Sequence, residues 1–351
     1  MKIIDKNISQ SVITIGCQHI SPKGGVAQVL NIYDKFIFSD FNKLSDTSDG
    51  GMAIKLLQFL ITCISLIIKL LFNKKIKIVH IHTSSYNSFK RSSYFVRIAK
   101  LMRRKIVLHV HGGAFKDFYT KSNKRVLNIL NMCDTIIALS EYWKSFFISV
   151  VDGPEVRVVK NPIEPPIFKD IPSDGKIHIL YLGLMSKDKG IYDLLDILKD
   201  NKSEYDGKIV VHLGGNGEIT NVLSRINNDG LHDIVKYEGW VTGDVKVDLM
   251  NQSNIFILPS YAEGLPLAIL EAISYGLYII STNVGGIPEV VKSDIGILFH
   301  PGDKDALKSA IDRCICYPLD FHKKLYIQKK SIDYMPCTIA NSLKEIYSKY
   351  L

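Results

Sequence analysis

The stretch N-I-F-I-L-P-S-Y-A-E-G-L-P-L-A-I-L-E-A-I-S-Y-G-L-Y-I-I-S-T-N-V-G-G-I-P-E-V, residues 254–290, decides the fold. Its apolar run at 255–258 predicts a buried strand, and Pro266 suits the first turn of a helix, where a missing N–H costs nothing. We expect that helix to run from about residue 265 to 275, and the run at 278–281 predicts a second strand. A strand, a helix and a strand in this order form a βαβ unit with parallel strands.

The same alternation of apolar strands and helical segments runs along the whole chain. Residues 161–175 contain four prolines, which deny this segment regular structure and predict a linker. The expected fold is therefore α/β, with two Rossmann-like, doubly wound parallel-sheet domains that face each other across a cleft, where ligands bind at the carboxyl ends of the strands. Strands are expected at 12–16, 76–82, 106–111, 135–139 and 156–159 in the first domain, and at 177–183, 209–213, 235–238, 255–258, 278–281 and 297–299 in the second.

Charge is distributed unevenly along the chain. The formal net charge is +9, but residues 1–165 hold 24 Lys and Arg against 11 Asp and Glu, whereas the remainder holds 20 against 24. A basic half is typical of proteins that meet nucleic acid, an anionic membrane or a phosphorylated substrate. The same composition is also compatible with an ordinary solvated surface.

The most apolar segment is residues 56–68, between Lys55 and Lys69. Its 13 uncharged residues are fewer than the roughly 20 that span a bilayer, so they predict a buried or an interfacial helix. Burial in the core is the interpretation favoured over membrane contact. The N-terminal residues are interrupted by charges and do not form the apolar run of a signal peptide.

Two glutamates stand eight positions apart in the deciding stretch. Glu263 precedes the predicted helix, and Glu271 lies about two turns into it, within an apolar run where an unpaired charge is costly. Carboxylates accept hydrogen bonds from vicinal hydroxyls, and a helix that starts near Gly264 and Leu265 points free N–H groups at a diphosphate. The pair is a candidate site for a nucleotide-linked sugar.

This segment resembles the donor site of retaining glycosyltransferases of the GT-B fold, in the large family 4. The resemblance rests on the E-x7-E spacing, the preceding P-S-x-x-E-G-L-P and the following V-G-G-I-P-E-V, and it extends over nearly the whole chain. It implies that Glu263 contacts the transferred sugar and Glu271 the ribose. It also implies an acceptor-binding domain at 1–165, a donor-binding domain at 166–325, and a C-terminal helical segment at 326–351 that packs back on the first domain.

The loop Y-L-G-L-M-S-K-D-K-G, residues 181–190, is similar to the family's G-R-L-x-x-x-K-G, in which Arg and Lys clamp the diphosphate. The resemblance gives this role to Lys189 and places Gly183 at the turn beside the donor. Leu184 stands where the family has its arginine, and this departure either weakens diphosphate binding or passes the task to Lys187. Alone, the K-D-K-G turn is equally compatible with a solvated loop.

The first domain carries two shorter motifs. In S-P-K-G-G-V-A-Q, residues 21–28, Gly24 and Gly25 let the backbone approach a phosphate, and they fall where the family has its G-G-V loop. In H-V-H-G-G, residues 109–113, His111 matches a family histidine near the transferred sugar. A structural histidine is the alternative.

The remaining motifs concern the nucleotide and metals. L-G-G-N-G-E, residues 213–218, resembles the family's G-x-G turn near the nucleotide through Gly215 and Gly217, although it could be a simple turn. A D-x-D pattern at 303–305 predicts a helix cap. Six cysteines without a C-x-x-C pair predict reduced thiols. We expect no metal and no cofactor besides the nucleotide-sugar substrate.

These features predict a retaining glycosyltransferase that moves a sugar from a nucleotide-sugar donor to a lipid-linked saccharide acceptor in lipopolysaccharide O-antigen or capsule biosynthesis. The residues assigned to catalysis are His111, Lys189 and Glu263, and front-face departure and attack are favoured because no nucleophilic carboxylate is identifiable. The basic half is then assigned to an anionic membrane and not to nucleic acid, so the expected location is the cytoplasm, peripheral on the inner face of the cytoplasmic membrane. The alternatives are a nucleotide-sugar epimerase of similar fold and a non-catalytic nucleotide-sugar binding protein.

Overall fold

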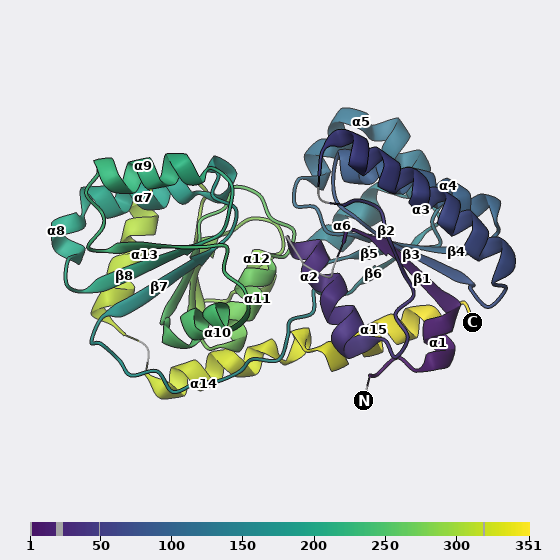
Figure 1. Ribbon diagram of the computed structural model, residues 1–351. Coiled ribbons are helices and arrows are strands. Elements are labelled where there is room, and N and C mark those ends of the chain that lie inside the picture. Colours follow the sequence, from purple (N-terminus) through teal and green to yellow (C-terminus); the bar gives the residue numbers. More distant parts are fainter. Residues whose placement is uncertain (1, 19–23, 49, 319) are drawn as a thin grey trace. The chain divides into compact units, whose positions relative to one another are not determined.

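The computed structural model, which describes residues 2–18, 24–48, 50–318 and 320–351, divides into two compact units (Figure 1). Unit 1 comprises Met1–Glu164 and Asp333–Leu351, and unit 2 comprises Pro165–Ile332. The first boundary between the two units, after Glu164, falls inside the proline-rich segment. The chain returns to unit 1 only at Asp333, so the expected boundary at 326 lies inside α14 (Phe321–Lys329), a helix of unit 2.

Unit 1 is built on a six-stranded sheet in the order β2-β1-β3-β4-β5-β6, with every pair parallel. Its central strands are buried on both faces, because helices cover both sides of the sheet, which explains their nearly continuous apolar sequence. The strands are β1 (Val12–Gly16), β2 (Lys43–Ser45), β3 (Ile78–Thr83), β4 (Lys105–Val110), β5 (Thr135–Ala138) and β6 (Glu155–Val158). The helices are α1 (Lys6–Ser11), α2 (Gly25–Ile32), the π-helical η1 (Tyr33–Ile37), α3 (Met52–Phe72), α4 (Asn87–Leu101), α5 (Phe115–Leu130), α6 (Glu141–Val150) and α15 (Pro336–Ser348).

Unit 2 has a second six-stranded parallel sheet, in the order β12-β11-β10-β7-β8-β9. The prediction of two doubly wound α/β domains is confirmed. The strands are β7 (Ile177–Leu182), β8 (Ile209–Gly214), β9 (Val235–Gly239), β10 (Ile255–Leu258), β11 (Tyr278–Thr282) and β12 (Gly296–Phe299). The helices are η2 (Lys187–Lys189), α7 (Ile191–Asp200), α8 (Lys202–Tyr205), α9 (Ile219–Asn228), α10 (Gly243–Gln252), α11 (Leu267–Ser274), α12 (Ile287–Val290), α13 (Lys304–Cys316) and α14, and η3 (Lys330–Tyr334) joins the two units.

One strand of unit 1 was not predicted from the sequence. β2 has only three residues, K-L-S, and all three are only partly buried. A strand so short, with a single apolar residue, carries neither an alternating nor a continuous hydrophobic pattern. It is recognisable only from its pairing with β1, at the edge of the sheet.

The expectation that residues 56–68 are buried in the core is wrong. They belong to α3, a helix of 21 residues, of which only Thr62, Leu66 and Leu70 are buried. A helix packed on a sheet buries one stripe, whereas the apolar residues of α3 occupy far more of its circumference. Most of them are therefore exposed.

Candidate functional site

The candidate site in unit 2 lies where the strand order reverses. β7 has β8 on one side and β10 on the other, so the loops that follow β7 and β10 leave the same end of the sheet from neighbouring strands. Ligands of doubly wound sheets bind at this reversal, beyond the carboxyl ends of the strands. The first loop carries Lys187 and Lys189, and the second carries Glu263.

Lys189 and Glu263 form an ion pair across this reversal. The Lys189 Nζ lies 2.5 Å from Oε1 of Glu263, and the Ser260 hydroxyl donates to the same oxygen at 2.8 Å. Glu263 is only 9% exposed, and Lys189 is partly exposed. The structure thus brings together a cation suited to a phosphate and a carboxylate suited to sugar hydroxyls. Sequence reasoning predicted both residues but not their mutual contact.

Two glycines allow the loops around this pair to touch. Gly190 has φ +69°, and a Cβ there would lie 2.1 Å from the carbonyl oxygen of Pro259. Gly285, after β11, has φ +56°, and a Cβ there would lie 2.0 Å from the carbonyl oxygen of Glu263. Any other residue would push the loops apart and strain the backbone. The V-G-G-I-P-E-V motif therefore has a packing role beside Glu263.

The glycines predicted near the nucleotide also lie together. Gly183 follows β7, and a Cβ on Gly215, which follows β8, would lie 1.8 Å from the Gly183 carbonyl oxygen. Gly217 pairs with Met185 in an isolated parallel bridge. Leu184, at the position of the family's arginine, is 47% exposed, and Lys187 is exposed. That Lys187 replaces this arginine stays a prediction.

Glu271 has a partner that the sequence did not predict. It lies in α11, is 7% exposed, and accepts bonds at 2.7 Å on both carboxylate oxygens from Nζ of Lys246 in α10. Lys246 belongs to no recognised motif, so the sequence alone does not identify it as the partner of Glu271. A buried carboxylate needs such a cation, which was the one available hint.

We expect the Lys246→Met variant to show an approximately tenfold higher KM for the donor with a nearly unchanged kcat, because Glu271 would lose the cation that orients it. Lys246→Arg is the matched control, since it keeps the charge. Steady-state kinetics against donor concentration measure the effect. An unchanged KM would argue that Glu271 does not touch the donor.

The helix after Glu263 begins later than predicted. α11 runs from Leu267, because Pro266 has an extended backbone with ψ 123° and serves as the N-cap. Gly264 and Leu265 are buried in the turn before it, and the Gly286 N–H donates to the Gly264 carbonyl at 2.8 Å. The helix start still follows directly on the Glu263 turn, where its dipole favours an anion.

In unit 1, Gly24 and Gly25 stand at the start of α2, where Gly24 is the N-cap with φ +106° and both are exposed. The rest of the predicted glycine loop, residues 21–23, lies outside the described residues. The short loop after β4 begins at His111, whose Nε2 lies 2.9 Å from Nδ1 of His82 in β3. Burial lowers the pKa of His111 to about 4.

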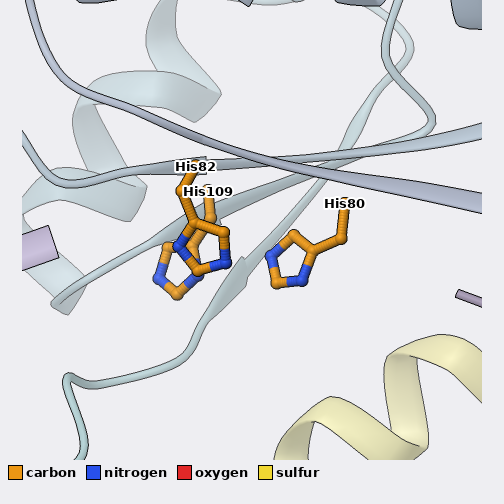
Figure 2. Close-up of side chains that lie close together, drawn as sticks. All are labelled: His80, His82 and His109. Carbon is orange, nitrogen blue, oxygen red and sulfur yellow. The ribbon is translucent and has the colours of Figure 1, made fainter. Parts of the chain in front are cut away.

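His111 stands at the rim of a cluster of histidines that sequence reasoning did not anticipate. His80 and His82 in β3 and His109 in β4 are 0–2% exposed, on one side of the sheet (Figure 2). The Tyr347 hydroxyl of α15 lies 2.7 Å from Nδ1 of His80. Burial, together with mutual repulsion, lowers the pKa of all three imidazoles.

Among the described residues, these three side chains form a cluster of potential metal ligands. One ring nitrogen of each lies within 4.8 Å of the others. Neutral imidazole is the form that binds zinc, at about 2.0–2.1 Å. The expectation that the protein needs no metal remains a prediction. By contrast, Asp303 of the D-x-D pattern caps α13 and accepts from the Ala306 N–H, as predicted.

A cavity in unit 2 lies away from these residues. It measures about 310 Å³ and is lined by residues that include Ile177, Asn254 and Tyr278. Those residues stand at the amino ends of β7, β10 and β11, opposite the Lys189–Glu263 pair. The candidate donor site is formed by the loops at the carboxyl ends of β7 and β10.

Comparison with known proteins matches nearly the whole chain. The family model described as "Glycosyltransferase Family 4" matches residues 46–165, and the one described as "Glycosyl transferases group 1" matches residues 164–329. The chain is 30% identical to an Escherichia coli UDP-Gal:alpha-D-GlcNAc-diphosphoundecaprenol alpha-1,3-galactosyltransferase, over 70% of this chain and 68% of the relative.

Two further likenesses extend this result. An uncharacterized glycosyltransferase of Methanocaldococcus jannaschii is 25% identical over 61% of this chain, and the match spans only 56% of that relative's length. Among solved structures, Anabaena HepE in complex with UDP has a TM-score of 0.73 at 19% identity, covering 97% of this chain and 100% of that one. This last likeness shows a shared fold.

Proposed function

The chain belongs to the glycosyltransferases of the GT-B fold, and from this we propose that it transfers a sugar from a nucleotide-sugar donor with retention of anomeric configuration. The observation that carries the proposal is the Lys189–Glu263 ion pair at the strand-order reversal of unit 2. A buried carboxylate and a cation side by side match the two halves of a sugar diphosphate.

In the proposed reaction each residue has one task. Glu263 accepts hydrogen bonds from the hydroxyls of the transferred sugar, and Glu271 accepts those of the ribose. Lys189 and the start of α11 stabilise the charge that accumulates on the leaving diphosphate. A role of the main chain at Gly24 and Gly25 in binding the phosphate or the acceptor stays a prediction.

A front-face mechanism fits the contacts of Glu263. Both Lys189 and Ser260 bind its Oε1, which ties the carboxylate into the loop as a binding group. The leaving phosphate would then take the proton of the acceptor hydroxyl as the new bond forms on the face from which the nucleotide departs. The role of His111 near the transferred sugar stays a prediction, and its lowered pKa keeps the ring neutral.

The proposed acceptor is a lipid-linked saccharide in bacterial surface-polysaccharide assembly. The Escherichia coli relative is named for transfer to a diphosphoundecaprenol-linked sugar. A second relative, also from Escherichia coli, is named as an O-antigen chain mannosyltransferase. The basic first half of the chain suits an enzyme that works in the cytoplasm on the inner face of the membrane.

We expect turnover of one nucleotide sugar only when a saccharide acceptor is present, with the acceptor mass increasing by one sugar. Mass spectrometry after incubation with UDP-, GDP- and dTDP-sugars, with and without undecaprenyl-diphosphate-linked N-acetylglucosamine, tests this. An isomerised sugar from donor alone would instead support an epimerase. Binding of a donor without turnover of it under any acceptor would support a non-catalytic binder.

A further inference from the structure

The polar side of α3 is turned toward the protein. Nε2 of Gln58 donates to the carbonyl of Ser45 at 2.9 Å, and the Thr62 hydroxyl donates to the same carbonyl at 2.5 Å. Nζ of Lys69 donates to Oδ1 of Asn42 at 2.8 Å. At 3.6 residues per turn, these three residues share one arc of about 40° of the helix circumference.

The opposite side of α3 is apolar and exposed. Its largest exposed fractions are 88% for Met52 and 84% for Phe72, at the two ends. In its most apolar 18-residue window the mean hydropathy is 2.1, and only 17% of that window is buried. Eleven of the 28 exposed large apolar residues in the described chain lie on this one helix: Met52, Ile54, Leu56, Leu57, Leu60, Ile61, Ile64, Ile67, Ile68, Leu71 and Phe72.

This arrangement is the reverse of a helix that covers a soluble domain. Such a helix turns its apolar stripe inward and its polar residues to water. α3 contributes Leu66 and Leu70 to the core of unit 1 but leaves a continuous apolar band outside. Exposed apolar patches of this extent mark contact with a partner or a membrane.

The charge around α3 points to the kind of partner. From residue 50 to residue 116 the sequence contains 13 Lys and Arg and not one Asp or Glu. Lys74 and Lys75 follow directly on the end of α3 and are exposed, and so are Lys90 and Arg97 on the neighbouring α4 (Figure 1). An apolar band beside exposed cations is complementary to an anionic surface that also has an apolar interior.

An exposed aromatic residue accompanies the band on α4. Tyr94 is 55% exposed and packs edge-on against Phe59 of α3, with ring centroids 5.5 Å apart. The Arg97 guanidinium lies over the Tyr94 ring at 5.8 Å. Tyrosine beside arginine is typical of the headgroup level of a bilayer, where the ring contacts acyl chains and the cation contacts phosphates.

We propose that the exposed face of α3 inserts into the interfacial layer of an anionic phospholipid bilayer, with the helix axis along the membrane plane. The proposal names the contact surface for the membrane location given under the proposed function and rests on that location. It does not depend on which donor or acceptor is used.

The helix does not need to leave unit 1 to make this contact. With 21 residues it measures about 31 Å, enough to cross a bilayer by length and composition. Crossing would, however, break the bonds of Gln58, Thr62 and Lys69 and remove Leu66 and Leu70 from the core. Lying flat keeps all of them and buries only the exposed band.

Vesicle flotation of the full chain tests the proposal. We expect flotation with phosphatidylcholine–phosphatidylglycerol vesicles, weaker flotation with phosphatidylcholine alone, and a decrease with added salt. The combined variant Leu57→Gln, Ile64→Gln and Leu71→Gln should bind at least about tenfold more weakly, because each side chain removed is exposed and apolar. The matched control replaces three exposed apolar residues elsewhere, Ile148→Gln, Leu223→Gln and Ile332→Gln, and should bind like the native chain.

Other results would overturn the proposal. Equal flotation of both triple variants would remove α3 from the contact, and retention of the native chain in membranes after an alkaline wash would show a spanning helix. A native dimer in light scattering that the α3 variant separates, without vesicle binding, would make the band a contact between two copies. Near-native thermal unfolding checks that the variants fold, and donor turnover with a soluble acceptor, which the α3 variant should retain, keeps failure of this proposal distinct from failure of the proposed enzymatic function.

Discussion

Glycosyl transfer by the Glu263→Gln variant is expected to fall by about a hundredfold, with little change in the stability of unit 2. Glutamine keeps the shape of the side chain but not its charge. Lys189 would lose the carboxylate that holds it at 2.5 Å, and the sugar hydroxyls would lose a charged acceptor that is 9% exposed. The measurement is kcat and KM for nucleotide release in the presence of acceptor.

A double-mutant cycle with Lys189→Met makes this result specific. Because the two side chains form one unit, the double variant should be only slightly slower than the poorer single variant, and not slower by the product of both effects. Glu204 and Lys308 provide a matched control pair on the surface of unit 2, 3.4 Å apart. Glu204→Gln should leave transfer unchanged. Near-native transfer by Glu263→Gln would remove this residue from the donor site.

The architecture could be predicted because it depends on local sequence pattern, and the position of the donor site stays a prediction. β10 begins and ends where its apolar run does, and eleven of the twelve strands overlap segments predicted from apolar runs. Glu263 and Lys189 were predicted from motifs on two separate loops. Their contact follows from the strand order, because β7 and β10 become neighbours only after the sheet is assembled.

The features that sequence did not disclose depend on partners distant in the chain. Lys246 in α10 meets Glu271 in α11, and a single lysine between two valines carries no sign of such a partner. For α3 the length of the uncharged run suggested burial, but burial is decided by how much of the helix the sheet can cover. The histidine cluster needs β3 and β4 side by side, and no single motif contains it.

Unit 1 is expected to lose about 6 kcal/mol of unfolding free energy between pH 7 and pH 5 through His80, His82 and His109. The pKa of each is lowered by burial, to about 3 for His80 and well below the ordinary value for the other two. Above pH 6.5 these rings are neutral in both the folded and the unfolded chain. Below pH 6.5 these histidines bind protons in the unfolded chain but stay neutral in the folded chain. The free energy of unfolding therefore falls as the pH decreases, by up to about 1.4 kcal/mol per pH unit for each ring.

Among the described residues, the side chains that act on the pKa values of these rings are other histidines and Lys43, and none is an anion. Tyr33 and Tyr347 face it from η1 and α15, their hydroxyls are buried, and burial raises the pKa of both, so they stay neutral. Lys43 acts in the same direction as burial, because its charge further lowers the pKa of His82. Protonation of these three histidines is therefore unfavourable in folded unit 1.

Urea unfolding followed by the fluorescence of Trp143 measures this effect in unit 1 alone, once Trp240→Phe has removed the tryptophan of unit 2. His80→Gln should lose about 2 kcal/mol less than the parent chain between pH 7 and pH 5, even if it is less stable at pH 7. His232→Gln, at an exposed position, should lose as much as the parent. Parallel pH curves for the parent and His80→Gln would show that His80 takes up its proton in the folded chain, which would contradict its burial as a neutral ring. A loss of about 6 kcal/mol is comparable with the whole stability of many domains, so unit 1 should approach its unfolding transition at pH 5 without denaturant.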